Sequence, residues 1–546
     1  MNICMVVCNN LTTDNRVLRE AQTLQAAGHQ VSVVGITPGT ADVPVEVLPD
    51  GVRLFRVNWR AEARRRLIIR ASPWAAFILA FCGAAFLAVA KVLAWVMFAT
   101  QRDQLRTGVA CAVLVVVLAI AWRAAVVLRR RAATRAQSVR SAMLRNGDAI
   151  SESDQAERFP APRSWIPQWV PPGLVNAFAV PLAFLGRRFS QFALSQERAR
   201  QMAKLAIDLR PDVIHAHDCT ALPIAARVKR AAGIPIVYDA HEIYAEAAVR
   251  RRGVVDYYIL LHRQYLPVVD RFITVNESIA RYYRFTHPEL SPAVVIRNAA
   301  ARFPDWDYDG RLHHAAELPR SEKILLYQGG FTARRGLEAL VRSAGYLPQG
   351  WTLVMMGWGP LEDKLRSIAV AEEPRCRPRI DGDPVGNLPR IRFIPGAPRA
   401  EVLHWTAGAA LGIIPYEGDV LNHWFCTPNK LWEFPSAGVP LIVQPFPELR
   451  RVVEKYRCGW IFPPDWTPAT LAETVGSLTE EQFREARDGC RRFINDDSWE
   501  EAYAPALIAL YDSLKQNARS LSMSNSTRVQ PGAGGFAGGA SSSAST

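Results

Sequence analysis

The sequence has few cysteines, and they are not arranged as a disulfide framework or a metal site would need. Its 546 residues hold nine of them, scattered along the chain without a C-x-x-C pair. Structural zinc sites and small secreted domains depend on closely spaced or regularly paired cysteines. We therefore interpret the nine as reduced, mostly buried thiols of a cytosolic protein.

Three other signatures are missing. The polar loop that follows residues 2–7 does not contain G-x-G-x-x-G, which excludes a dinucleotide-binding fingerprint at this strand. No G-x-S-x-G segment occurs, so a serine hydrolase with a nucleophile elbow is disfavoured. Residues 2–7 have the pattern of a strand, and Asp14, Arg16 and Arg19 follow closely, so we expect no cleavable signal peptide.

The composition is both apolar and basic. Hydrophobic residues make up 49% of the chain and the mean hydropathy is -0.01, which is high for a soluble protein and predicts a membrane element. The net charge is +14 and the isoelectric point is about 9.6. Such a charge balance suits nucleic acid, anionic lipid or phosphorylated substrates as partners.

Strand-like and helix-like segments alternate through two parts of the chain. In the first part we expect helices at residues 15–27 and 221–232, and strands at 2–7, 30–35, 52–57, 212–216, 235–238, 271–275 and 294–297. Such alternation predicts a doubly wound parallel sheet of the α/β class. We therefore assign residues 1–58 and 195–300 to one Rossmann-like domain.

A second set of strands begins after an expected linker at residues 301–322. These strands are expected at 323–328, 352–356, 391–394, 409–415 and 439–443. We assign 323–495 to a second Rossmann-like domain and 496–515 to a final helix, on which Trp499, Tyr503 and Leu507 are spaced along one face. The tail at 516–546 turns to Ser, Gly and Ala without hydrophobic periodicity, which is typical of disorder.

A hydrophobic insertion, residues 59–194, interrupts the first domain. Residues 74–90 and 108–122 are apolar runs that, with their extensions, reach the roughly 20 residues that a bilayer span needs. Arginines flank both ends, so the positive-inside rule predicts a hairpin with both ends in the cytoplasm. Residues 160–192 combine Trp, Phe and Pro with basic residues, as a segment at the headgroup level does. The alternatives are a hairpin that dips into one leaflet, a buried soluble helical pair, and a Pro-rich loop packed on the domain.

The second domain contains the segment CTPNKLWEFPSAGVP at residues 426–440. Thr427 and Pro428 form a helix-entry signal, and a glycine stands where the helix should end. Asn429 and Glu433 share one face of that helix. A helix N-terminus at the carboxyl end of a strand attracts anions, and a carboxylate one turn further in accepts hydrogen bonds from hydroxyls. The pattern fits a nucleotide, with phosphates on the cap and ribose on Glu433; an ordinary α/β helix with a solvated Glu is the alternative.

Two glycine turns follow strands of the second domain. Gly329 and Gly330 begin a loop that also carries Arg334 and Arg335, and Gly357 begins the other turn. Glycines let a backbone approach phosphate, and arginines offer several donors to a diphosphate. We predict a phosphate site here, against the alternative of a solvated charged face.

In the first domain two neighbouring strands end in ionisable residues. The segment HAHD at 215–218 ends one strand, and DAHE at 239–242 ends the next. The spacing H-x-H-D is not that of a structural zinc site and no cysteine completes it, so we predict no metal site. Because the strand ends of two such domains lie across a cleft from each other, we interpret the cluster as a candidate for chemistry.

Six segments occur in the order found in a known family: DNRVLREA, DVIHAHD, YDAHE, VIRNAA, YQGGFTARRG and TPNKLWEFPSAGVP. Together they resemble the retaining family-4 glycosyltransferases of the GT-B fold, over about residues 1–58 and 195–515. The resemblance implies an acceptor on the N-terminal domain and a UDP- or GDP-sugar on the C-terminal one. It implies no cofactor and no required divalent metal, since helix N-termini and cationic side chains carry the charge of the leaving diphosphate.

The resemblance also implies roles for individual residues. Glu433 would bind the ribose, and Arg335 would bind the diphosphate in place of the family's usual lysine. His217 would lie beside the reacting sugar. His241 would line the acceptor side.

The form TPNKLWEF resembles a branch of the family in which Pro428, Asn429 and Lys430 shape the pocket. Two departures stand out. Phe425 replaces the first Glu of the family's E-x7-E motif, and Gly330 stands where many relatives place an Arg. The groups that touch the 3- and 4-hydroxyls of the transferred sugar therefore stay unassigned.

We predict a membrane-associated retaining glycosyltransferase at the inner or plasma membrane, with its catalytic domains in the cytoplasm. It would build a lipid-linked glycan or surface polysaccharide precursor from a nucleotide sugar, with membrane lipids and no nucleic acid as partners. A nucleotide-sugar epimerase of similar shape and a catalytically silent membrane scaffold are the alternatives. His217, Arg335 and Glu433 speak against the scaffold, and the hairpin speaks against the epimerase.

Overall fold

The computed structural model describes residues 1–11, 14–37, 45–58, 194–246, 252–300, 308–372, 390–463 and 465–527. The expected membrane hairpin and the segment at 160–192 lie outside these residues. Within the described ranges, no helix combines the length and the apolar character that crossing a membrane requires. The six cysteines in the same ranges are all free and none is exposed, as the sequence predicted.

The first domain is built on an eight-stranded sheet with the order β3-β4-β2-β1-β5-β6-β7-β8. Every pair is parallel except β3 with β4. Its described elements are β1 (Asn2–Val6), α1 (Asn15–Ala26), β2 (Gln30–Ile36), β3 (Glu46–Val47), β4 (Arg53–Val57), a helix at 194–208, β5 (Val213–His217), α6 (Leu222–Ala232), β6 (Ile236–Ala240), α7 (Arg252–Tyr265), β7 (Arg271–Thr274), α8 (Glu277–Thr286) and β8 (Ala293–Val295).

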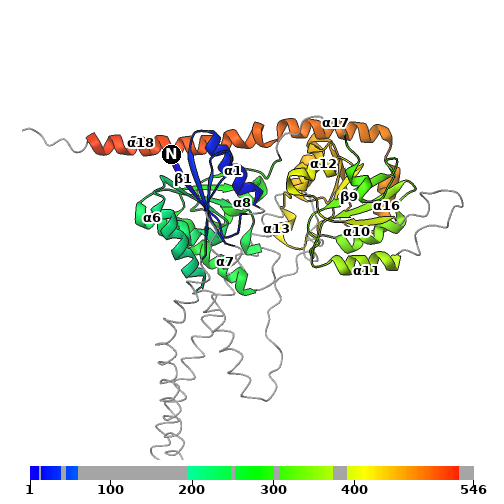
Figure 1. Ribbon diagram of the computed structural model, residues 1–546, viewed down its shortest axis with the longest axis horizontal. Helices are drawn as coiled ribbons and strands as arrows, with labels where there is room; N and C mark the ends of the chain where they lie inside the picture. The colour runs from blue at the N-terminus through cyan, green and yellow to red at the C-terminus, as the bar shows by residue number, and fades with distance from the viewer. Residues whose placement is uncertain are drawn as a thin grey trace, which may run out of the picture.

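The second domain has a six-stranded, all-parallel sheet with the order β11-β10-β9-β12-β13-β14. Its described elements are α9 (Arg311–Ala315), β9 (Lys323–Gln328), α10 (Leu337–Ser343), β10 (Trp351–Met356), α11 (Glu362–Glu372), β11 (Ile391–Ile394), α12 (Val402–Thr406), β12 (Leu411–Ile414), α13 (Leu421–Trp424), α14 (Lys430–Ser436), β13 (Leu441–Val443), α15 (Pro447–Tyr456), β14 (Gly459–Ile461), α16 (Pro468–Ser477) and α17 (Glu480–Asp496). The two domains lie side by side in Figure 1.

The central strands of both sheets are buried, which explains why the sequence located them. The strands β1, β5 and β6 are almost entirely inaccessible to solvent, as are β9 and β10. Strands of a parallel sheet are covered by helices on both faces, so they read as continuous apolar runs. The short edge strands β3 and β14 carry no such run and were not predicted.

The expected linker at 301–322 is partly folded into the second domain. Helix α9 lies in it, Arg311 donates to Glu401 of the second domain at 2.8 Å, and Arg392 donates to the carbonyl of Ala316 at 3.0 Å. Part of the expected linker therefore forms a short helix in contact with the second domain. A short helix with two histidines offers little hydrophobic periodicity, so no helix was predicted there.

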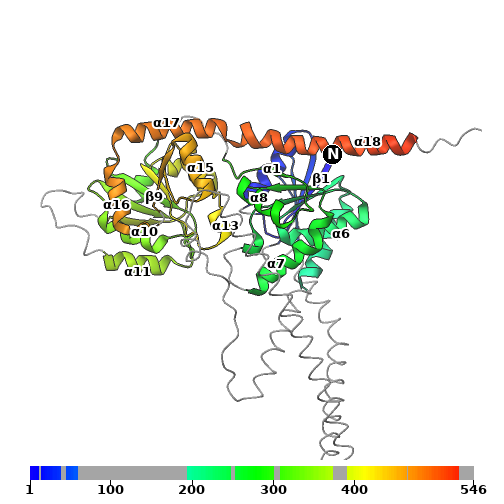
Figure 2. The ribbon, with the colours of Figure 1, turned by 180° about the vertical axis from the view of Figure 1, so that it is seen from behind.

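The C-terminal helices join the two domains. Figures 1 and 2 show α17 along the second domain and α18 (Ala504–Thr527) continuing along the first. A π-helical turn at Trp499–Tyr503 connects them. Trp499, Tyr503 and Leu507 are all buried, as their common face predicted. The indole of Trp499 donates to the Thr23 hydroxyl at 2.9 Å, so this crossing fixes α18 on the first domain.

Helix α18 also corrects the tail prediction. Residues 516–527 belong to the helix, and only the rest of the expected disordered tail, 528–546, lies outside the described residues. Extending an existing helix costs far less than nucleating one, so polar residues without periodicity can continue it. Hydrophobic periodicity located the docked part of α18 and missed its continuation.

Candidate active site

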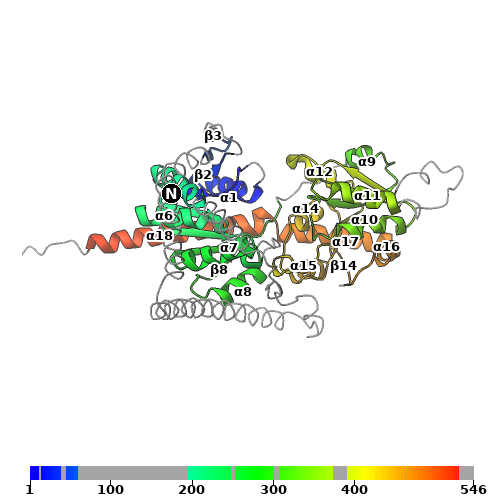
Figure 3. The same ribbon diagram turned by 90° about the horizontal axis from the view of Figure 1, so that it is seen from below.

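A cavity of about 330 Å³ lies between the two domains. Most of its lining comes from the first domain, and Asn429 and Glu433 come from the second: the full set is Asn9, Asp14, Asn15, Arg16, Arg19, His241, Glu242, Asn298, Ala300, Asn429 and Glu433. Figure 3 shows α14, which carries Glu433, on the side of the second domain that faces the first. Open α/β sheets bind ligands at the carboxyl ends of their strands, which is where these residues lie.

Arg16 connects three segments of the first domain beneath this cavity. Its guanidinium donates to both carboxylate oxygens of Asp239, at 2.7 Å and 3.0 Å, and to the carbonyl of Ile296 at 2.6 Å. It also donates to the side-chain oxygen of Asn298 at 3.0 Å. Burial alone would raise the pKa of Asp239, but Arg16, followed by His241, holds it well below its usual range. Asp239 is therefore a permanent anion at the floor of the cavity.

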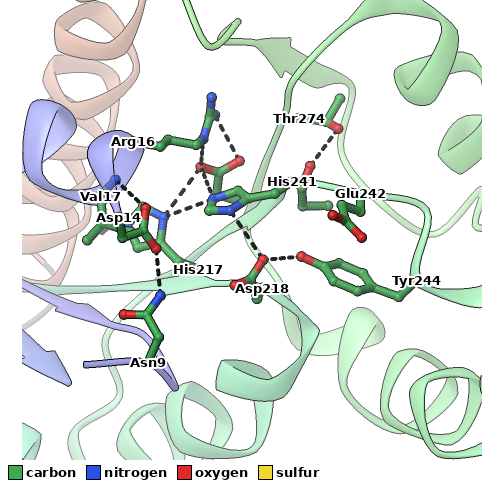
Figure 4. Close-up of polar contacts among 12 residues, drawn as sticks. Asn9, Asp14, Arg16, Val17, His217, Asp218, His241, Glu242, Tyr244 and Thr274 are labelled. Carbon is green, nitrogen blue, oxygen red and sulfur yellow. Dashed lines mark hydrogen bonds and ion pairs between the residues drawn. The ribbon is translucent and has the colours of Figure 1, made fainter. Parts of the chain in front are cut away.

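His241 lies between two carboxylates at the cavity wall (Figure 4). Its Nε2 is 3.1 Å from Asp239 Oδ2 and its Nδ1 is 3.2 Å from Asp218 Oδ1. Burial opposes protonation of the ring, but Asp218 and Asp239 together raise the pKa of His241 to about 9. At neutral pH the ring is an imidazolium, which donates hydrogen bonds and cannot accept a proton.

The position of Asp218 is set by an unusual backbone conformation. Its φ is 67°, in the left-handed region that most side chains avoid. The Tyr244 hydroxyl donates to the same carboxylate. A strained residue held by a second side chain is typical of a functional site, because the surrounding structure must keep it there.

His217 lies next to His241 but does not line the cavity. It is fully buried, with Nδ1 3.4 Å from both His241 Nε2 and Asp239 Oδ2. The structure thus brings together the two histidines that the sequence singled out. Of the two, His241 is the one exposed to a ligand in the cavity.

A second buried layer lies below His217. The ring of His215 stacks on that of His217 with centroids 4.1 Å apart, and its Nδ1 is 2.8 Å from the Tyr511 hydroxyl of α18. Burial raises the pKa of Glu20, next to His215, to about 7. Within the described residues, one group has the spacing of metal ligands: Glu20, His215, His217 and Asp239. Arg16 already lies against both carboxylates, with Nε 3.2 Å from Glu20 Oε1, so we assign the cluster to charge pairing.

On the second domain, two cations converge on the hydroxyl of Tyr416, just after β12. Arg335 donates to it and to the Thr332 hydroxyl, with its guanidinium 4.7 Å from the centroid of the Tyr416 ring. Lys430 donates to the same hydroxyl at 3.2 Å. Burial lowers the pKa of Lys430. The sequence identified both cations, but nothing in it marked Tyr416 as their common partner.

The glycine loop is built around these cations. Gly329 has a φ of 119°, and a Cβ there would lie 2.9 Å from Lys430 Nζ. Lys430 therefore places a cation beside the loop. Arg334 points elsewhere, with Nη1 3.0 Å from Asp419 Oδ2. Of the two arginines expected on the diphosphate, only Arg335 is grouped with Lys430.

Glu433 lies one turn into α14 and lines the cavity. Gln328, at the end of β9, donates to one of its oxygens at 2.7 Å, which orients the carboxylate. The expected helix start was wrong, because α14 begins at Lys430 with Asn429 as its N-cap. A residue before proline prefers an extended backbone, and the Thr427 hydroxyl instead accepts a hydrogen bond from Asn276 of the first domain at 3.2 Å.

Contacts between the domains close one side of the cavity. Asn276, at the start of α8, also donates to the carbonyl of Phe425 at 2.8 Å. The backbone N–H of Ser278 donates to Glu448 at 3.0 Å, and that of Ile243 to the side chain of Asn422 at 2.9 Å. Phe425 is buried and contributes its backbone to this junction.

Comparison with known proteins agrees with this architecture. Residues 151–299 match a family described as glycosyl transferase 4-like domain. Over 341 residues the chain is 27% identical to a glycogen synthase of Mycobacterium tuberculosis (strain CDC 1551 / Oshkosh), covering 58% of this chain and 73% of that protein.

Two solved structures share the fold at low sequence identity. A sucrose-phosphate synthase from Thermosynechococcus elongatus is 14% identical, with a TM-score of 0.57 over 95% of this chain and 100% of that one. An α,α-trehalose-phosphate synthase (UDP-forming) from Burkholderia xenovorans, solved with glucose-6-phosphate, is 11% identical, with a TM-score of 0.54 over 94% and 100%. The chain thus carries a glycosyl transferase 4-like domain within a GT-B glycosyltransferase fold.

Proposed function

We propose that the protein is a glycosyltransferase that moves a sugar from a nucleotide-sugar donor to a hydroxyl group of an acceptor. One observation carries this proposal: Glu433 of the second domain and the imidazolium of His241 of the first line one cavity, and two grouped cations lie on the second domain, one of them on the helix that carries Glu433. Glu433 is suited to the ribose hydroxyls. Arg335 and Lys430 are suited to the diphosphate.

The chemistry assigned to these groups is charge stabilisation. As the bond between the sugar C1 and the diphosphate oxygen breaks, negative charge grows on the diphosphate, and Arg335 and Lys430 stabilise it. The acceptor oxygen forms the new bond to C1, and its proton leaves with the diphosphate or to solvent. His241 is charged at neutral pH and both of its N–H groups face carboxylates, so its role is to place a positive charge beside the substrate.

The compared proteins support a nucleotide-sugar donor. Their names describe the synthesis of glycogen, sucrose phosphate and trehalose phosphate, the last of them UDP-forming. A UDP- or GDP-sugar is therefore our proposed donor. We also propose retention of the anomeric configuration and no requirement for a metal, as the resemblance of the six sequence motifs implies. Product anomers assigned by NMR test retention, and full transfer in the presence of EDTA tests metal independence.

The acceptor and the location are proposals from the sequence. The apolar runs within residues 74–128 and their flanking arginines fit an enzyme at the inner or plasma membrane, with its catalytic domains in the cytoplasm. Such a location suits a lipid-linked glycan or a surface polysaccharide precursor as the acceptor.

Our first prediction compares two neighbouring arginines. In a transfer assay with a panel of UDP- and GDP-sugars, Arg335→Ala should lower kcat by about 100-fold or more, because its charge matters most as the leaving group develops. Arg334→Ala is the matched control and should retain most activity, because Arg334 pairs with Asp419. Circular dichroism and thermal unfolding confirm that both variants fold. Full activity of a folded Arg335→Ala variant would contradict the role, and a wild type without transfer to any acceptor would contradict the function.

The second prediction concerns His241. Because its pKa is raised from 6.5 to about 9, the imidazolium is present at neutral pH and is lost as pH rises through about 9. The stability that the charged ring contributes to the fold should be fully present below pH 6.5 and should be lost as the pH rises through about 9. The transfer rate should therefore fall with an apparent pKa near 9, and His241→Gln should lack that limb. His314→Gln, at an exposed histidine, should keep the wild-type profile. If the transfer rate of His241→Gln falls with the same apparent pKa as that of wild type, the titrating group is not His241.

The third prediction concerns the membrane. If residues 74–128 form a hairpin with both ends in the cytoplasm, a cysteine introduced at Arg102 should react with an impermeant reagent in intact cells. A cysteine at Arg140 should react only after lysis. Both should be made in a background without the native cysteines. Protection of both positions in intact cells would exclude a spanning hairpin.

A further inference from the structure

The proposed donor site leaves the nucleobase without a partner. Glu433 is on α14, which follows β12, and Arg335 is on the loop that follows β9. Strands β9 and β12 are neighbours in the sheet, so ribose and diphosphate occupy the ends of these two strands. The base must then extend over the neighbouring strand end on one side or the other, at β13 or at β10.

The β13 side is closed by the first domain. Glu448, on the helix that follows β13, accepts a hydrogen bond from the backbone N–H of Ser278 at 3.0 Å and is fully buried. Arg297 lies 3.7 Å from the same carboxylate. These contacts fill the space beyond β13, so the β10 side is the one that a base can enter.

An exposed tryptophan stands at the end of β10. Trp358 is 66% exposed, more than any other aromatic side chain in the described part of the chain. One edge of its indole lies over the loop after β11, since a Cβ on Gly396 would be 2.1 Å from the indole Cζ3. The rest of the ring is open to solvent at the carboxyl end of a parallel sheet, where ligands bind.

The backbone around Trp358 is fixed to the glycine loop of the phosphate site. The Trp358 carbonyl accepts a hydrogen bond from the N–H of Phe331 at 2.8 Å. A Cβ on Gly357 would lie 2.0 Å from the carbonyl oxygen of Gly329, and a Cβ on Gly359 would lie 2.5 Å from that of Phe331. The two glycines therefore let the turn close on the phosphate loop, and this contact holds the indole at a fixed distance from the cations.

We propose that Trp358 is the platform on which the nucleobase of the donor stacks. The inference rests on the proposed function, because it requires a nucleotide with its ribose at Glu433. A flat aromatic ring held in position stacks on the face of any base, so it supplies affinity without reading the base edge. UDP and GDP should both depend on it.

Calorimetric titration of the full chain with UDP and with GDP tests this inference. Alanine replacement of a stacking aromatic weakens binding by about 5-fold to about 150-fold. We expect a loss in that range for Trp358→Ala and a loss of only about threefold for Trp358→Phe, which retains a flat ring. Tyr346→Ala removes another exposed aromatic side chain away from the strand ends and should bind like wild type. Inorganic pyrophosphate, which has no base, should bind to wild type and to Trp358→Ala with equal affinity.

Three results would overturn the inference while leaving the proposed function intact. Unchanged binding in Trp358→Ala would mean that the base lies elsewhere. Tighter binding would mean that the indole fills the base site and must move away. An equal loss for pyrophosphate would mean that the substitution disturbs the phosphate loop. If wild type binds neither nucleotide, the proposed function fails and this inference fails with it.

Discussion

Arg16 makes four hydrogen bonds from a position that water hardly reaches, and the first-domain side of the cavity depends on them. A buried guanidinium is costly unless its charge is compensated and its donors are used, and Asp239 supplies the charge. Because the same carboxylate also faces His241 and His217, the pair fixes the position of both histidines and helps to keep His241 charged. Loss of either partner would leave an unpaired buried charge, which is among the most destabilising changes a protein can undergo.

The two domains place different charges on their sides of the cavity. On the first domain, carboxylates surround the cavity histidine and keep it protonated. On the second, Arg335 and Lys430 lie together on the uncharged hydroxyl of Tyr416, and neither forms an ion pair with a carboxylate within the described residues. Cations held together without a carboxylate are available to an anionic ligand, and a diphosphate is the ligand that the proposed donor provides. This asymmetry is why we propose that the donor binds on the second domain.

The sequence predicted the fold well because the decisive elements are buried. Continuous apolar runs located β1, β5, β6, β9 and β10, and residues at the ends of four of these strands make up much of the site. Three of the misses in the site have a common cause. The start of α14, the partner of Arg334 and the burial of His217 are set by contacts between segments far apart in the chain, such as the bond from Asn276 to Thr427. Local pattern carries no information about such contacts.

Tyr416 and Trp358 were missed for another reason. Each follows a strand and has no charge, so each reads as ordinary core or loop until the neighbouring cations and the open strand end are seen. Chemistry-bearing residue types drew attention to Glu433, Arg335 and His241, and the structure groups these around or beside one cavity. Tyr416 and Trp358 could be recognised only from their surroundings in the structure.

The central claim is that a nucleotide binds between the domains with its ribose on Glu433. Calorimetric titration of UDP and GDP against wild type and Glu433→Ala tests it most directly, with Glu338→Ala, at an exposed glutamate paired with Lys364, as the control. Loss of hydrogen bonds to a charged group costs about 1.5 to 3 kcal/mol, so affinity should fall by about 10-fold to 150-fold in Glu433→Ala alone. Equal affinity in wild type and a folded Glu433→Ala variant would contradict the account.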